Sequence, residues 1–158
     1  MLAVTLKWIF VVLHIITAAA WFGLGLIIAR HGKAALSADA SARAAILSLG
    51  SRIVRIMSIM IVLTLVFSWG SFFAGGAFPA YPPQYHISFT LIVVLVAIHF
   101  FLIRSPWNRL SAALTDGAAE ASSHAKRISI GVGSGHLLWL VILVLMFWTE
   151  LSGALGLV

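Results

Sequence analysis

Residues 8–28 read WIFVVLHIITAAAWFGLGLII, an apolar run in which His14 is the only ionisable side chain. A helix needs about 20 mostly apolar residues to cross the roughly 30 Å hydrocarbon core of a bilayer. Three further runs of this kind follow, so we predict an all-α fold: an integral membrane four-helix bundle forming a single domain over residues 1–158. The predicted spans are 8–28, 53–73, 87–103 and 130–148.

The composition supports the membrane assignment. Hydrophobic residues make up 62% of the 158 positions and charged residues only 9%, which is too little polar surface to cover a soluble globule. The small residues 17–20 resemble a signal cleavage site, but the apolar run continues to Ile28, so we predict a retained first span. Cysteine is absent, which excludes a disulfide, a thiolate copper or iron–sulfur site and a covalent c-type haem.

The positive charges predict the orientation. Nine of the ten Lys and Arg residues lie between the first and second spans or between the third and fourth, or at the ends of these spans. The positive-inside rule therefore places both connections in the cytoplasm and both termini outside. We expect a bacterial inner (cytoplasmic) membrane protein, and this charge distribution gives no support to nucleic-acid binding.

Two of the histidines within the spans are predicted to lie at the same depth. His99 is five residues, about 8 Å, from Arg104, and His136 is about 9 to 12 Å from the same boundary on the next span. Matching depth on neighbouring helices is what two axial ligands of one haem iron require. Gly131, Gly133 and Gly135 would let a flat ring approach His136.

Arginines next to this level are candidate partners for haem propionates. Arg55, about a turn inside the second span, is the strongest candidate, and Arg127 is another. An isolated histidine in a membrane often only hydrogen-bonds neighbouring helices, so a structural role for His99 and His136 remains open. A shared iron ligand is favoured by their common depth.

His14 is predicted in the outer half of the bilayer, roughly 14 Å from the His99 level. Ala18, Trp21 and Gly25 follow it at helical spacing and would form a groove of small residues beside the imidazole. His86 could pair with it in a second, outer haem; packing or hydrogen bonding to a quinone are the alternatives. We expect His31 and His124 to be solvated in loops.

The connections contain helix-start signals. Residues 37–41, SADAS, offer N-cap residues for an alanine-rich helix that continues into the second span, and residues 105–107, SPW, predict the start of a separate short helix ending at Asp116. Residues 75–83 are predicted to form a tight, uncharged crossover. We place Trp107 in the inner aromatic belt.

Residues 13–25, LHIITAAAWFGLG, resemble the first-helix signature of small bacterial membrane proteins related to copper resistance protein D and the haem-containing J-type protoporphyrinogen oxidase. Those proteins share a histidine, a Trp-Phe/Leu-Gly step one to two turns later, and further histidines in a bundle of four or more helices. The resemblance covers mainly the first span. It implies a membrane b-type haem or copper site with His14 as a metal ligand.

The preferred hypothesis is a b-type haem protein, with one or two haems, that transfers electrons within the bilayer to or from a quinone or a partner redox subunit. His99, His136 and His14 are the candidate iron ligands. One alternative is a structural accessory subunit that associates with other membrane subunits or with itself. Another is copper handling, because Met57 and Met60 lie near the depth of His99 and His136, and thioether with imidazole suits Cu(I). No residue has the pattern of a dedicated nucleophile or general acid.

Overall fold

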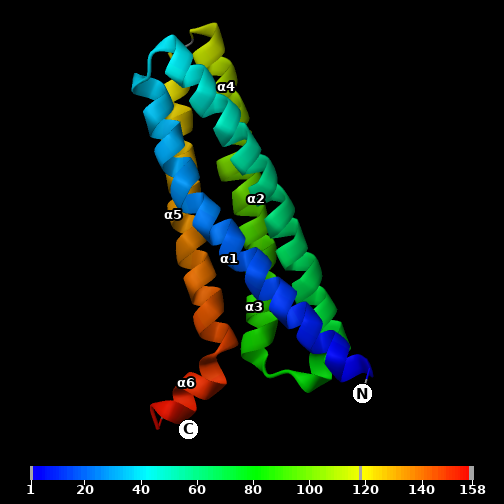
Figure 1. Cartoon of the computed structure of the whole chain (residues 1–158). Helices are drawn as coiled ribbons and strands as arrows, with labels where there is room; N and C mark the ends of the chain where they lie inside the picture. Colours follow the sequence, from blue (N-terminus) through cyan, green and yellow to red (C-terminus); the bar gives the residue numbers. More distant parts are fainter. Residues whose placement is uncertain (1, 118, 157–158) are drawn as a thin grey trace.

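The computed structural model describes residues 2–117 and 119–156, and these residues form helices joined by short turns. Both termini lie at one end of an elongated bundle, and the turn between the first two helices lies at the other end together with α4 (Figure 1). The elements in chain order are α1 (Leu2–Ser37), α2 (Ala40–Ala74), the 3₁₀ turn η1 (Phe78–Ala80), α3 (Pro83–Ile98), the π-helical turn η2 (His99–Arg104), α4 (Ser105–Asp116), α5 (Ala121–Met146) and α6 (Trp148–Ala154).

Four helices are long and apolar enough to cross a membrane, which confirms the predicted all-α four-helix bundle. They are α1, α2, α5 and one continuous helix, Pro83–Asp116, made of α3, η2 and α4. The longest has 36 residues, or about 54 Å at 1.5 Å per residue, so it exceeds the hydrocarbon thickness. The helices therefore extend beyond the predicted spans.

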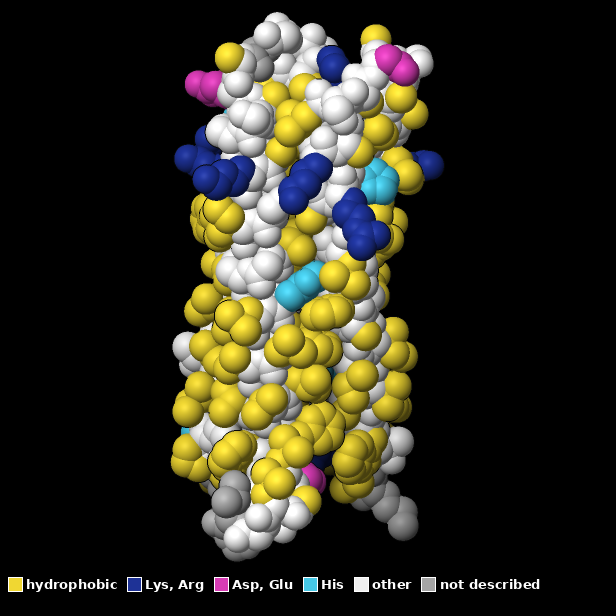
Figure 2. Space-filling model, turned by 90° about the vertical axis from the view of Figure 1, so that its left-hand side faces the viewer, with side chains coloured by type: hydrophobic (Ala, Val, Ile, Leu, Met, Phe, Trp, Pro, Cys, Tyr) yellow, Lys and Arg dark blue, Asp and Glu magenta, His cyan; other side chains and the backbone are white. Residues whose placement is uncertain are grey.

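Positive side chains gather near the end that carries the α1–α2 turn, above a broad hydrophobic belt (Figure 2). We call this end the basic end. By the positive-inside rule it faces the cytoplasm, with both termini on the opposite side. Helices that continue past the apolar belt carry these charges on helical rather than loop residues.

The third span corrects one boundary. Residues 105–107 do not begin a separate helix, because the chain runs through them from η2 into α4. Pro106 has no N–H and its ring would clash with the carbonyl of Leu102 in a regular helix. The preceding turn instead widens to π geometry, with the Ser105 N–H bonded to the Phe100 carbonyl. The predicted end at Asp116 is confirmed, since Gly117 follows in the left-handed conformation with φ 71°.

The turn between α1 and α2 is held by side-chain caps. Asp39 accepts a hydrogen bond from the Ala42 N–H at 2.9 Å, which confirms an N-cap within residues 37–41. Arg43 donates from Nε to the Ala35 carbonyl and from Nη2 to the Ala38 carbonyl, at 3.2 and 2.8 Å. One arginine thus supplies donors to carbonyls at the end of α1 that have no partner within the helix.

Trp107 is fully buried, so its predicted place in the inner aromatic belt is wrong. Its indole N–H donates to Ser51 Oγ at 3.1 Å, and its ring packs against Gly50. A Cβ at position 50 would overlap the indole, so glycine is what lets α4 approach α2 closely.

Candidate functional site

His99 is completely buried at the first position of η2 and uses both ring nitrogens. The Trp21 Nε1–H donates to His99 Nδ1 at 3.2 Å. An indole N–H can only donate, so Nδ1 must be the unprotonated acceptor and the ring proton lies on Nε2. That proton points to Ser58 Oγ, 2.9 Å away, and the Ser58 hydroxyl donates in turn to the Val54 carbonyl at 2.8 Å.

The result is a closed hydrogen-bond chain that connects α1, η2 and α2. Each donor has an acceptor, and the chain ends on a backbone carbonyl. Such a network satisfies a neutral imidazole inside the hydrocarbon layer, where an unpaired polar atom would be costly. In this arrangement His99 has no free nitrogen with which to bind a metal.

His136 lies at the same level, as the sequence predicts, and meets the same tryptophan. The Trp21 ring lies 6.3 Å from the His99 ring and 6.0 Å from the His136 ring, measured between centroids. The other contact of His136 is Phe22, whose ring stacks on the imidazole at 4.1 Å. The two predicted ligands are therefore gathered around one indole.

The Nε2 atom of His136 is buried and has no hydrogen-bond partner among the described residues. It is pressed against Gly25 of α1, where a Cβ would lie 2.6 Å from it. Gly135, one residue earlier on α5, makes room for the Trp21 ring, since a Cβ there would lie 2.9 Å from that ring. The glycines thus serve close packing of α1 against α5, and His136 keeps one unused nitrogen.

His14 occupies a separate level nearer the termini. Its Nδ1–H donates to the Thr64 carbonyl at 3.0 Å, and the Thr64 hydroxyl lies 3.0 Å from that of Thr17. Six residues of α2, about 9 Å, separate Thr64 from Ser58, the partner of His99. Gly25, predicted to lie beside His14, packs against His136 instead.

His86 is not brought to His14. Its ring contacts Phe72 of α2 and Phe78 of η1, with centroid distances of 6.2 and 5.3 Å, and its Nε2 is buried without a partner in the described part of the chain. Phe72 lies eight residues, about 12 Å, beyond Thr64 along α2. The two imidazoles therefore sit at different depths, and their pairing on one iron stays a prediction.

The predicted propionate partners lie on the surface. Arg55 and Arg127 are both exposed, and neither has a printed contact with a histidine of the site. Met57 is fully buried in the hydrophobic core, with Met60 packed against it, as expected of apolar filling. Among residues 2–117 and 119–156, no group of three or more His, Asp or Glu side chains is arranged to hold a metal ion.

The loop histidines differ from expectation at one position. His124 was expected to be solvated, but it is buried at the start of α5, with Nε2 4.0 Å from Glu120. The cause is that α5 begins at Ala121, so His124 lies on a helix face that packs into the bundle. His31 is half-buried and bonds the Ile27 carbonyl of its own helix at 3.0 Å.

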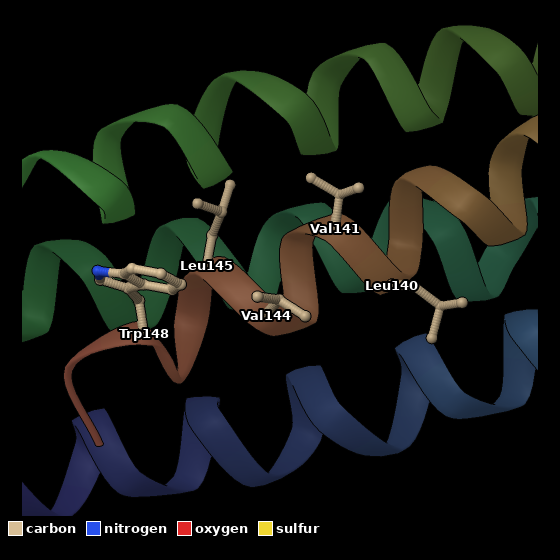
Figure 3. A pocket seen from close by; sticks show the side chains of 5 residues that line it. All are labelled: Leu140, Val141, Val144, Leu145 and Trp148. Carbon is tan, nitrogen blue, oxygen red and sulfur yellow. The ribbon is translucent and has the colours of Figure 1, made fainter. Parts of the chain in front are cut away.

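The hollows of the surface are apolar and away from these imidazoles. One, of about 290 Å³, is lined by five side chains of α5 and α6 and holds no histidine (Figure 3). Another, of about 540 Å³, follows residues 4–13 of α1. The first hollow is lined by Leu140, Val141, Val144, Leu145 and Trp148.

Comparisons of the chain with protein-family models, with curated proteins and with solved structures gave no match. The resemblance of the first span to the copper-resistance and haem proteins therefore stays a prediction. The two partners of His99, Trp21 and Ser58, were not assigned from the sequence. The available signal was a polar side chain in the middle of a span on each neighbouring helix.

Proposed function

We propose that the protein is a structural subunit of a larger membrane assembly, with intramembrane polar residues that fix its own helices. The observation that carries this proposal is the closed chain from Trp21 through His99 and Ser58 to the Val54 carbonyl. It uses every hydrogen-bonding atom of the most buried histidine for contacts between helices. We place the assembly in a bacterial inner membrane, with the basic end in the cytoplasm.

Two outward glycines support a partner in the bilayer. Gly23 on α1 and Gly133 on α5 have no atom of the described chain within 4 Å of an added Cβ. Glycine lowers helix stability by about 1 kcal/mol relative to alanine, so it is expected where packing requires it. Neither glycine has an internal packing role, and small residues on a membrane helix allow another helix to approach.

Extraction of the tagged full-length chain from its native membrane in mild detergent tests this proposal. We expect a stoichiometric partner subunit and no bound chromophore. Gly133→Leu should reduce the recovered partner, whereas Ala97→Leu, which enlarges an exposed residue of α3, should leave it unchanged. A chain recovered alone, with or without these substitutions, would contradict the proposal.

The second candidate function is b-type haem binding and electron transfer, with a quinone or a redox subunit as partner. It is favoured by one observation, the buried Nε2 of His136 that has no partner in the described chain. The surroundings do not fit a bis-histidine haem in this arrangement, because both His99 nitrogens are engaged and Trp21 contacts both imidazoles. The proposed ligand is therefore His136. When bound, haem would supply one-electron chemistry.

A redox spectrum of the protein expressed with supplied haem separates the two candidates. A b-type α-band on dithionite reduction, lost in His136→Ala and kept in His31→Ala, would support haem binding. Absence of the band in the wild-type protein would exclude it. Copper without haem in elemental analysis would favour copper handling instead.

A further inference from the structure

Two hydrogen bonds fix α2 against the third spanning helix near the basic end. Ser58 of α2 meets His99 at 2.9 Å, and Ser51 of α2 meets Trp107 at 3.1 Å. Because the two helices run in opposite directions, the segment 51–58 lies alongside the segment 99–107. The relative depth and facing sides of the two helices are thus set at two points.

Arg55 and Arg104 lie between these two points. Arg55 falls between Ser51 and Ser58 on α2, and Arg104 falls between His99 and Trp107 on the facing helix. Their Cα atoms are therefore at closely similar depth.

Helical geometry directs both side chains to the same side of the seam between the two helices. Arg55 precedes Ser58 by three residues, and Arg104 precedes Trp107 by three residues, which corresponds to a rotation of about 60° from the facing direction in each case. Equal rotations on antiparallel, facing helices turn both residues toward the same side. That side is the outer surface, since both arginines are exposed.

The two guanidinium groups have no carboxylate partner in the described part of the chain, where the one ion pair is His124 with Glu120. Arg104 is oriented by its stacking on Phe100, with the guanidinium carbon 5.3 Å from the ring centroid. Two converging guanidinium groups suit the oxygen atoms of a phosphate, which they bind through paired N–H donors.

We propose that Arg55 and Arg104 form a binding site for the phosphate of an anionic phospholipid. A lipid is favoured over free phosphate because the site opens on the membrane-facing surface, where Ile59 and Phe101 are 50% and 75% exposed beside it. These side chains offer apolar contacts to the acyl chains. Basic residues at the cytoplasmic boundary attract anionic headgroups. The site is independent of the function proposed above.

Lipid binding to the full-length protein in detergent micelles tests the site by native mass spectrometry. Phosphatidylglycerol is titrated against phosphatidylcholine. We expect Arg55→Gln with Arg104→Gln to weaken phosphatidylglycerol binding at least about tenfold, given the contribution expected of two basic residues, and Arg55→Gln alone about threefold. The control, Arg30→Gln with Arg109→Gln, removes the same charge from exposed positions on α1 and α4 and should change it less than about twofold.

Each outcome is decisive. Equal weakening in both double variants would replace the site by a general charge effect, and unchanged binding in the Arg55 and Arg104 double variant would overturn it. Displacement of the lipid by millimolar inorganic phosphate would identify a free-anion site and also overturn it. Unfolding temperatures in phosphatidylcholine alone should match the wild type, because neither guanidinium has a hydrogen-bond partner in residues 2–117 and 119–156; if the double variant does not fold, Arg55→Gln alone provides the test.

Discussion

The indole N–H of Trp21 donates to Nδ1 of His99 across 3.2 Å, and this bond joins α1 to the π-helical turn of the third span. It also determines the proton position on His99, because an indole nitrogen cannot accept. The imidazole must then donate through Nε2 to Ser58. The interaction makes His99 a bridge between three helices.

Ser58→Ala should lower the free energy of unfolding by about 1–2 kcal/mol, since it leaves the His99 Nε2–H buried without an acceptor. Reversible unfolding in mixed detergent micelles measures this change. Ser129→Ala is the matched control, because the Ser129 hydroxyl bonds only the Ala125 carbonyl of its own helix. The control should stay within about 0.5 kcal/mol of the wild type. Equal losses in the two variants would contradict the bridging role.

Gly131→Ala should lower stability by about 1–3 kcal/mol through overpacking. An added Cβ would lie 2.7 Å from the Leu102 carbonyl oxygen, and backbone can move aside only if α5 shifts away from η2. Gly133→Ala has nothing within 4 Å, so it should leave stability unchanged or raise it by up to about 1 kcal/mol through helix propensity. Unfolding in the same micelles gives both values. A neutral Gly131→Ala would show that the helices are not in close contact here.

The spans could be predicted because a membrane helix must be both long and apolar, a pattern that hydropathy reveals directly. Their ends could not, because helices continue past the hydrocarbon layer. Arg30 marks the end of the first apolar run, yet α1 continues to Ser37. Pro106 was misread for a related reason: proline favours a helix start, but a π turn can accommodate it within a continuous helix.

At the site, depth could be predicted and the facing direction could not. The rise per residue was enough to place His99 and His136 at one level. Their partners depend on how the helices cross. Gly25 shares a face of α1 with His14, but it meets α5 while His14 meets α2, because α1 packs against both helices at different heights. Sequence spacing alone contains no crossing angle.

Acidification should destabilise the α1–α2 turn through Asp39. The hydrogen bond from the Ala42 N–H, helped by the Ser41 hydroxyl, holds the Asp39 pKa below its ordinary value of 3.8. A carboxylate whose pKa is lower when folded adds stability above its unfolded pKa and loses it as the pH falls through the folded value. Between pH 6 and pH 3 the unfolding temperature of the wild type should therefore fall more than that of Asp39→Asn, which caps without a charge. Parallel pH profiles would exclude a contribution from this cap.

His99→Leu and His136→Leu should differ in cost although the two residues lie at one depth. His99→Leu leaves the Trp21 N–H buried without an acceptor and removes the donor to Ser58, and should cost about 2–4 kcal/mol. His136→Leu removes a nitrogen that has no partner in the described chain, so it should change stability by less than about 1 kcal/mol. Unfolding of both variants without added haem gives the comparison.

Supplied haem extends the His99 and His136 comparison to function. A ligand that binds the folded state through His136 raises the stability of the wild type and not of His136→Leu. The accessory-subunit proposal predicts no such difference, because no atom of His136 is then used for binding. A wild-type protein stabilised by haem, with His136→Leu unaffected, would therefore overturn the structural proposal and support the haem hypothesis. Equal large costs for the two leucine variants without haem would instead show that His136 has a structural partner of its own.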